Sequence, residues 1–241
     1  MKKKYIKKIL AASVISLLFV QVLYIFVIEP TVTTAATPAS DTVLVTLNVT
    51  SGVSITPGAD APMTPDLGIS ANQSIGNSAW TVKTNSVTGY TLAVKADNAP
   101  ALRVLADPTN RFFADYTETA GTCSNVTYTT RATCEGASAI WTPTPEQWAT
   151  STGSKEFGYS AYGTDVPAKW GTGSSCGSAG VPLTTMNYAG FTTTNNDIAS
   201  SGTVTTTTGT TTNICFAAEQ NTVFAPSGTY NATITATASA I

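Results

Sequence analysis

Apolar and polar residues alternate in short runs along this chain, and the alternation predicts β-strands. Between residues 42 and 50, every second residue is aliphatic: Val43, Val45, Leu47 and Val49. Successive side chains of a strand point to opposite faces, so we expect this run to be a half-buried strand. Val53 and Ile55 indicate a short partner strand, and two prolines predict a loop at residues 60–66.

The clearest pair of runs lies at residues 80–84 and 90–96. Apolar residues share one face of each run: Trp80 and Val82 in the first, and Tyr90, Leu92, Val94 and Ala96 in the second. Residues 85–89 join the runs and end in Gly89, which is typical of a turn. Two alternating runs joined by a five-residue, glycine-ended loop predict an antiparallel hairpin.

Three later runs complete the predicted strands, at residues 157–163, 214–218 and 229–240. Residues 99–180 otherwise form an irregular, insert-like region. Glycine, threonine and proline interrupt every window that could support a long helix. Many short strands without a βαβ rhythm predict an all-β chain, folded as an antiparallel β-sandwich with an irregular loop region.

The first 28 residues have the pattern of an export signal. Five lysines fall within residues 2–8, and nearly uninterrupted apolar residues follow from Ile9 to Ile28. Twenty apolar residues in a helix span roughly 30 Å, enough to cross a bilayer. Residues 1–28 are therefore expected to be a hydrophobic helix, either a signal peptide or a signal anchor, with the lysines on the cytoplasmic side. Residues 29–41 are expected to be a linker, and residues 42–241 the sandwich domain.

Export explains the four cysteines, because an even number in an oxidising compartment indicates disulfides. Of the three possible connectivities, we favour Cys123–Cys134, which closes a short local loop, and Cys176–Cys215, which ties a long loop to a late strand. Metal binding is the competing interpretation. No two cysteines have Cys-x-x-Cys spacing, and the chain contains no histidine to complete a site.

Composition and charge exclude several functions. Only 11% of the 241 residues are charged, against about a quarter in ordinary proteins. Of 12 basic residues, five lie in the N-terminal patch, which leaves 7 against 14 acidic ones. A nucleic-acid binder needs a basic surface for phosphates, so no nucleic-acid partner is expected.

The chain also lacks the residues that most enzymes use. Without histidine, the commonest general base is missing. Residues 173–177 match the Gly-x-Ser-x-Gly elbow of serine hydrolases, but no histidine and no following helix support it. We therefore expect a non-enzymatic protein with no catalytic residues, no cofactor and no metal, in which the membrane is contacted only through the N-terminal segment.

Three tryptophans lie in the irregular region: Trp141, Trp148 and Trp170. They allow two interpretations. The rings can pack beneath the loops as part of the core. Alternatively, they can form a ligand-facing surface that stacks on a sugar ring or fills a pocket of a partner protein.

Several short sequences resemble secreted β-sandwich surface proteins of bacteria, including Trp-x-Leu cell-wall domains and fimbrial or pilin-like subunits. The residues that carry the resemblance are Trp80–Asn85, Gly89–Leu92, Phe157–Ser160, Ile214–Phe216 and Gly228–Ile234. Residues 128–135 also look like a small disulfide-looped insert of such proteins. The resemblance implies an immunoglobulin-like or pilin-like sandwich, although the repeated Trp-x-Leu signature is missing.

The function that follows as an expectation is a structural or adhesive component of the cell surface. Its expected partners are envelope components, further copies of itself, or a surface glycan or protein. Self-assembly would use strand addition at a sheet edge, because residues 229–240 carry no charge that blocks an edge. The alternative is a monomeric extracellular module that binds carbohydrate or protein through the loop tryptophans.

Overall fold

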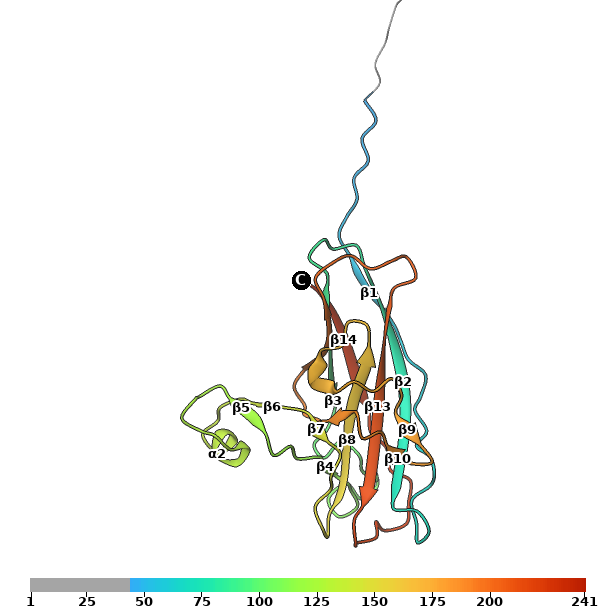
Figure 1. The fold of residues 1–241 in the computed structure, drawn as a ribbon, viewed down its shortest axis with the longest axis vertical. Helices are drawn as coiled ribbons and strands as arrows, with labels where there is room; N and C mark the ends of the chain where they lie inside the picture. Colours follow the sequence, from blue (N-terminus) through green and yellow to red (C-terminus); the bar gives the residue numbers. More distant parts are fainter. Residues whose placement is uncertain (1–43) are drawn as a thin grey trace, which may run out of the picture. The chain divides into compact units, whose positions relative to one another are not determined.

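The computed structural model describes residues 44–241, and these are mostly strands and loops (Figure 1). The predicted hydrophobic segment at residues 1–28 and the linker at residues 29–41 lie outside the described residues. Within residues 44–241, no helix is long and apolar enough to cross a membrane. Val49–Ile241 form one compact unit.

The largest sheet has five strands. In spatial order they are β1 (Val53–Thr56), β2 (Gln73–Thr84), β13 (Thr210–Gln220), β8 (Lys155–Gly163) and β4 (Ala114–Asp115). All neighbours are antiparallel except β4 and β8, which are parallel. The central strand β13 pairs along most of its length with both β2 and β8.

The second sheet has three antiparallel strands. In spatial order they are β12 (Asn196–Ser201), β3 (Tyr90–Ala96) and β14 (Ile234–Ala240). A register shift interrupts the pairing of β12 with β3 between Asp197 and Ala199. In this sheet β3 is the central strand, and β12 and β14 are its edges.

Three two-stranded sheets and two short helices complete the described structure. The sheets pair β5 (Gly121–Cys123) with β6 (Trp141–Pro143), β7 (Glu146–Gln147) with β11 (Asn187–Tyr188), and β9 (Gly177–Ser178) with β10 (Val181–Pro182). The helices are α2 (Arg131–Gly136) and the 3₁₀ turn η1 (Ala168–Trp170). Residues 121–143, which contain β5, α2 and β6, form an arm that projects from the sheets (Figure 1).

Both large sheets contribute side chains to one hydrophobic core. Its largest members are Trp80, Tyr90, Leu92, Phe157, Tyr159, Trp170, Phe191, Ile198, Ile214 and Phe216. Alternation in each strand turns one set of side chains toward this core, as the sequence pattern predicts. A second cluster, which includes Cys215 and Ala217, lies on the other face of β13, so that β13 is buried on both faces.

The predicted hairpin of residues 80–84 and 90–96 is wrong, although both strands end and begin where expected. The first run is the end of β2 and the second is β3, but the two strands belong to different sheets and do not pair. Their connection turns at Gly89, whose φ is 85°. A Cβ there would lie 1.9 Å from the carbonyl oxygen of Ser201, so the crossing requires glycine.

The prediction of a strand at residues 42–50 is wrong for its described part. Residues 44–50 have no assigned secondary structure and are exposed. Alternation makes a segment suitable for a half-buried strand, but a strand also needs a neighbour, and no strand in the described part of the chain pairs with this segment. The predicted strands at 53–55, 157–163 and 214–218 are confirmed as β1, β8 and β13, and the final one is confirmed from Ile234 onward as β14.

Candidate functional site

The outer edge of β14 is the most distinctive feature of the described surface. β14 pairs with β3 from Ile234 to Ala240, and no other strand within residues 44–241 forms a ladder with it. The seven residues of β14 include no charged side chain and no proline. Charges, prolines and bulges are the usual means of blocking an edge strand, so the unpaired backbone groups of β14 are open to another strand.

Small side chains line the inner face of β14. Ile234, Ala236 and Ala238 are half-buried and pack against the main core, while the intervening threonines and Ser239 lie on the opposite face. Alanine fills little of the space beneath an edge strand.

A pocket of about 1190 Å³ lies beside the first residue of β14. Its apolar floor comes from the main core and includes Trp80, Phe157 and Phe216. Residues 57–67 line one part of it, and residues 225–232 with Ile234 line another. Polar residues, among them Asp60 and Asp66, also line this space, so it offers both apolar and polar contacts.

Residues 44–50 carry alternating apolar side chains that are exposed. Val45, Leu47 and Val49 recur at every second position and are 86%, 83% and 76% exposed. The segment has no charged residue. An exposed apolar alternation of this kind is unusual on a protein surface unless it binds something.

Hydrogen bonds hold the chain directly after this segment. The amide nitrogen of Gly52 donates to Oδ1 of Asn85 at 2.7 Å, and Nδ2 of Asn85 donates to the carbonyl oxygen of Thr50 at 2.8 Å. The hydroxyl of Thr84 donates to the carbonyl oxygen of Gly52 at 2.9 Å. The start of β1 is thereby fixed to the end of β2.

Two of the three loop tryptophans are buried. Trp170 is 0% exposed and packs against Tyr159, with ring centroids 5.1 Å apart. Trp141 is 8% exposed and covers Gly121 at the base of the arm. Neither ring faces solvent, so the structure places both in packing positions instead of on a ligand-facing surface.

The third, Trp148, is partly buried and anchored. Its indole Nε1 donates to Oε2 of Glu219 at 2.7 Å, and its ring stacks on Tyr116 with centroids 4.8 Å apart. It also meets Tyr188 edge to face. Both the polar atom and the faces of this ring are therefore engaged with its own chain.

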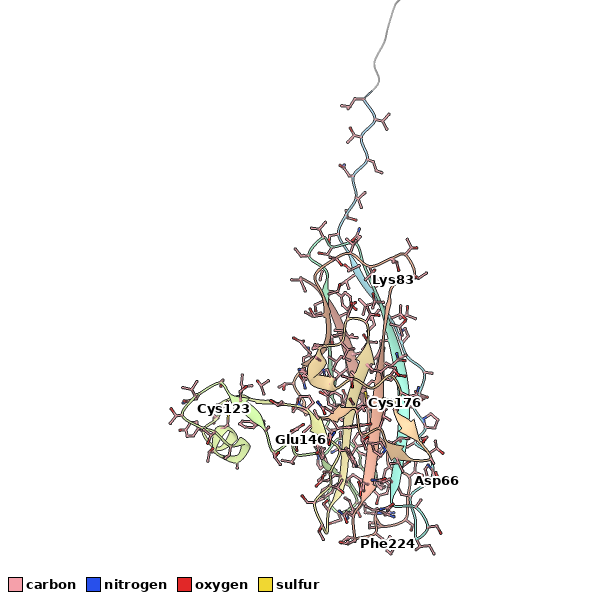
Figure 2. The ribbon with its side chains drawn as sticks, viewed as in Figure 1. Asp66, Lys83, Cys123, Glu146, Cys176 and Phe224 are labelled. Carbon is pink, nitrogen blue, oxygen red and sulfur yellow. A yellow bond between two sulfur atoms is a disulfide. The ribbon has the colours of Figure 1, made fainter. Side chains whose placement is uncertain are left out.

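Both predicted disulfides are confirmed. Cys123–Cys134 closes the arm, whereas Cys176–Cys215 ties a loop to β13 within the second cluster (Figure 2). Cys176 is the cysteine of the hydrolase-like sequence at residues 173–177, so its sulfur is engaged in a structural bond. Two disulfides are typical of an extracellular or otherwise oxidising environment.

A pair of buried acidic residues was not anticipated from the sequence. Glu156 of β8 and Glu219 of β13 are directly opposite each other across the ladder. Burial raises the pKa of Glu156, and the neighbouring carboxylate of Glu219 adds to the rise. Only the pairing of β8 with β13 brings the two together, and that pairing is not visible in the sequence.

The other pKa shifts in the described residues result from the packing of the side chains. Burial raises the pKa of Tyr90, Tyr116, Tyr159 and Tyr188, the last to about 12. Burial also lowers the pKa of Lys169, whose ammonium lies over the Trp170 ring. The tyrosines therefore stay neutral at physiological pH and act as packing and hydrogen-bonding groups.

Comparison with known proteins identifies no relative of this chain. No protein-family model matches the chain, and no curated protein or solved structure matches it either. Within residues 44–241, no three acidic or cysteine residues gather closely enough to hold a metal ion. The candidate site is therefore defined by the free β14 edge and the neighbouring pocket.

Proposed function

We propose that this protein is a non-enzymatic, exported component of the cell surface, structural or adhesive, that self-assembles through a sheet edge. The single observation that carries the proposal is the outer edge of β14, which is uncharged, seven residues long and not paired with any strand of residues 44–241. Unpaired backbone donors and acceptors in an edge strand act as a template for a strand of another molecule.

The proposal includes a β-sandwich for the body of the molecule. Support comes from the main core, to which β2, β8 and β13 contribute from one sheet and β3, β12 and β14 from the other. Two sheets that bury one face each against a common core are the defining feature of a sandwich. Such a body presents its edges at the sides, where neighbouring molecules can reach them.

Export and anchoring fit the same proposal. The lysine-rich start and the apolar run of residues 9–28 would direct the chain across the membrane and, if uncleaved, would hold it there. The two disulfides are consistent with the oxidising side of that membrane. The competing role as a tryptophan-based binding module is less favoured, because Trp141 and Trp170 are buried and Trp148 is held by Glu219.

The test is to produce the full chain in a bacterial envelope and to examine the surface fraction by negative-stain microscopy and native electrophoresis. The wild-type chain should form filaments or ordered oligomers. Thr237→Lys places a charge on β14 and should reduce assembly. The matched control is Thr211→Lys, at an exposed position of β13, whose neighbours are already paired. A wild-type chain that stays monomeric at every concentration would contradict the proposal.

A further inference from the structure

We propose that the pocket between residues 57–67 and residues 225–232 binds an uncharged oligosaccharide. Its volume is about 1190 Å³. Ligand pockets in proteins are typically about 300–1000 Å³, so this one is large enough for several sugar rings. The inference goes beyond the proposed self-assembly and does not depend on it, because only Ile234 of β14 lines the pocket.

Small side chains on two strands of the largest sheet leave this space open. Ser74, Gly76 and Ser78 alternate along β2 and are buried, so they share the face that is turned toward the core. On β13, Ala218 lies directly opposite Ser74. A Cβ at Gly76 would lie 3.2 Å from the carbonyl oxygen of Pro62, so glycine allows residues 57–67 to pass close over β2. The hollow is thus a consequence of the sequence of these strands.

Hydrogen bonds hold the first wall of the pocket, residues 57–67, against β2. The hydroxyl of Ser78 donates to the carbonyl oxygen of Ala59 at 2.7 Å. The backbone of Thr64 exchanges two hydrogen bonds with the backbone of Ile75. A wall that is already fixed loses little conformational freedom when a ligand binds, which favours affinity.

The second wall, residues 225–232, is also fixed and carries an aromatic ring. The hydroxyl of Tyr230 donates to the carbonyl oxygen of Pro226 at 2.7 Å, and its ring meets Phe113 edge to face at 5.2 Å. The backbones of Asn231 and Arg103 exchange two hydrogen bonds. Tyr230 and Phe113 both line the pocket, so they offer aromatic surface to the apolar C–H groups of a sugar.

Polar groups that lack a partner indicate a ligand with hydroxyl groups. Trp80 and Ser74 line the pocket and are only 9% and 3% exposed, yet neither the indole N–H nor the hydroxyl forms a hydrogen bond within residues 44–241. Asp60 and Asp66 line it too, and their carboxylates have no partner in the described part of the chain. A sugar hydroxyl can accept from the N–H and donate to a carboxylate.

Charge excludes acidic ligands from this pocket. The lining contains two acidic side chains, Asp60 and Asp66, and no lysine or arginine. Arg111 reaches Gly228 at one wall, but it does not itself line the pocket. A carboxylate, sulfate or phosphate on the ligand would therefore be repelled. An organic cation would suit the carboxylates but would leave the buried indole N–H without an acceptor.

The remaining ligand classes fit the lining less well. A wholly apolar ligand would remove water from the unpartnered N–H, hydroxyl and carboxylates without replacing their hydrogen bonds, which is costly. A peptide that binds as a strand needs a free sheet edge along its length. The pocket meets β14 only at Ile234, and Thr64 already bonds to β2 at Ile75. An uncharged sugar satisfies both the polar and the aromatic groups.

The first experiment measures binding by the full chain, extracted from a bacterial envelope in a detergent without a sugar head group. Saturation-transfer NMR tests four uncharged probes, maltohexaose, cellohexaose, mannohexaose and chitohexaose, and two charged ones, hexagalacturonate and hexalysine. At least one uncharged probe should bind with a Kd below about 1 mM, and neither charged probe should bind as tightly.

The second experiment changes the pocket. Asp60→Ala combined with Asp66→Ala removes both carboxylates and should raise the Kd of the bound probe by at least about tenfold. Both residues are exposed, so the double variant is expected to fold, which a thermal melt checks. The matched control is Asp197→Ala, at an exposed position of β12 outside the lining, and it should leave the Kd unchanged. Trp80→Phe keeps an aromatic ring but removes the N–H, and should raise the Kd by about fivefold.

The outcomes separate this proposal from self-assembly. Thr237→Lys should reduce assembly and leave sugar binding unchanged, and a monomeric wild-type chain that binds sugar would contradict only the proposed assembly. Three results would overturn the sugar site: no binding of any uncharged probe, tighter binding of a charged probe, or a Kd that the Asp60 and Asp66 double variant leaves unchanged. An equal loss of binding in Asp197→Ala would overturn it as well.

Discussion

Glu156 on β8 lies directly opposite Glu219 on β13, and the structure buries both acidic side chains. Gln73 and Trp148 donate hydrogen bonds to Glu219, at 2.9 and 2.7 Å. Glu219 thus accepts two hydrogen bonds, while burial and the neighbouring carboxylate of Glu219 raise the pKa of Glu156. The pair places an electrostatic cost near one end of the largest sheet, at the start of β8 and the end of β13.

This cost predicts a pH-dependent stability. The pKa of Glu156 is higher in the folded than in the unfolded chain, so the folded state binds more protons as the pH falls toward the ordinary glutamate pKa. The ionised Glu156 therefore destabilises the fold above that value, and acidification removes the penalty. Glu156→Gln should raise the melting temperature at pH 7 by roughly 2–4 °C, equivalent to about 1 kcal/mol, and should change it little at pH 4.

Calorimetry at the two pH values measures this difference. Asp60→Asn, at an exposed loop position, is the control and should have little effect at either pH because exposed charges are screened. An equal effect of Glu156→Gln at pH 7 and pH 4 would show that the carboxyl acts by shape alone.

The two disulfides should contribute unequally to stability. Cys176–Cys215 spans 39 residues and joins a loop to the central strand, so replacing both cysteines with serine should cost about 2–4 kcal/mol of unfolding free energy. Cys123–Cys134 spans 11 residues within the arm, whose β5, β6 and α2 pack mainly on one another. Its removal should loosen the arm and lower the main melting transition much less. Equal losses in the two double-serine variants would show that the arm is part of the same cooperative unit.

Trp170 tests the packing role of the loop tryptophans. Its ring is fully buried in the main core, so Trp170→Ala should cost about 3–5 kcal/mol of unfolding free energy. Denaturant unfolding followed by circular dichroism measures the loss. The exposed Val126→Ala in the arm is the control and should change stability by less than about 0.5 kcal/mol. A stable Trp170→Ala variant that loses binding to a glycan would instead favour a ligand-facing ring.

Gly89 should tolerate no side chain. Its φ of 85° and the nearby carbonyl of Ser201 predict that Gly89→Ala costs roughly 2 kcal/mol or more. Gly202→Ala is a matched control a short distance away, because nothing lies within 4 Å of the Cβ it would add. Thermal melts of the two variants should differ by several degrees. Similar melts would mean that the crossing between the sheets can relax around a methyl group.

The sequence pattern located strands more successfully than it located their partners. Alternation and Gly89 placed the ends of β2 and β3 correctly, because burial on one face imposes a period of two wherever a strand lies. The pattern cannot tell whether the next strand is a neighbour in the same sheet or lies across the core. For this reason the sequence predicts one hairpin from β2 and β3, although they belong to two sheets.

The candidate site was predictable in its parts but not in its assembly. The uncharged final strand is visible in the sequence, yet only the structure shows that, among the described strands, β14 pairs along one edge alone. Glu156 and Glu219 lie opposite each other only because of the register between β8 and β13, which are distant in sequence. Long-range register carries no local signal, so the sequence could not reveal it.

The central position of β13 has a consequence for how the chain reaches its native state. β2 and β8 are distant in sequence, and each needs β13, which comes near the C-terminal end, as its neighbour. Pairings between such remote segments form slowly, because a long loop must close before they gain any contact. A nascent chain therefore lacks the strand that completes its largest sheet until Gln220, the last residue of β13, has been synthesised.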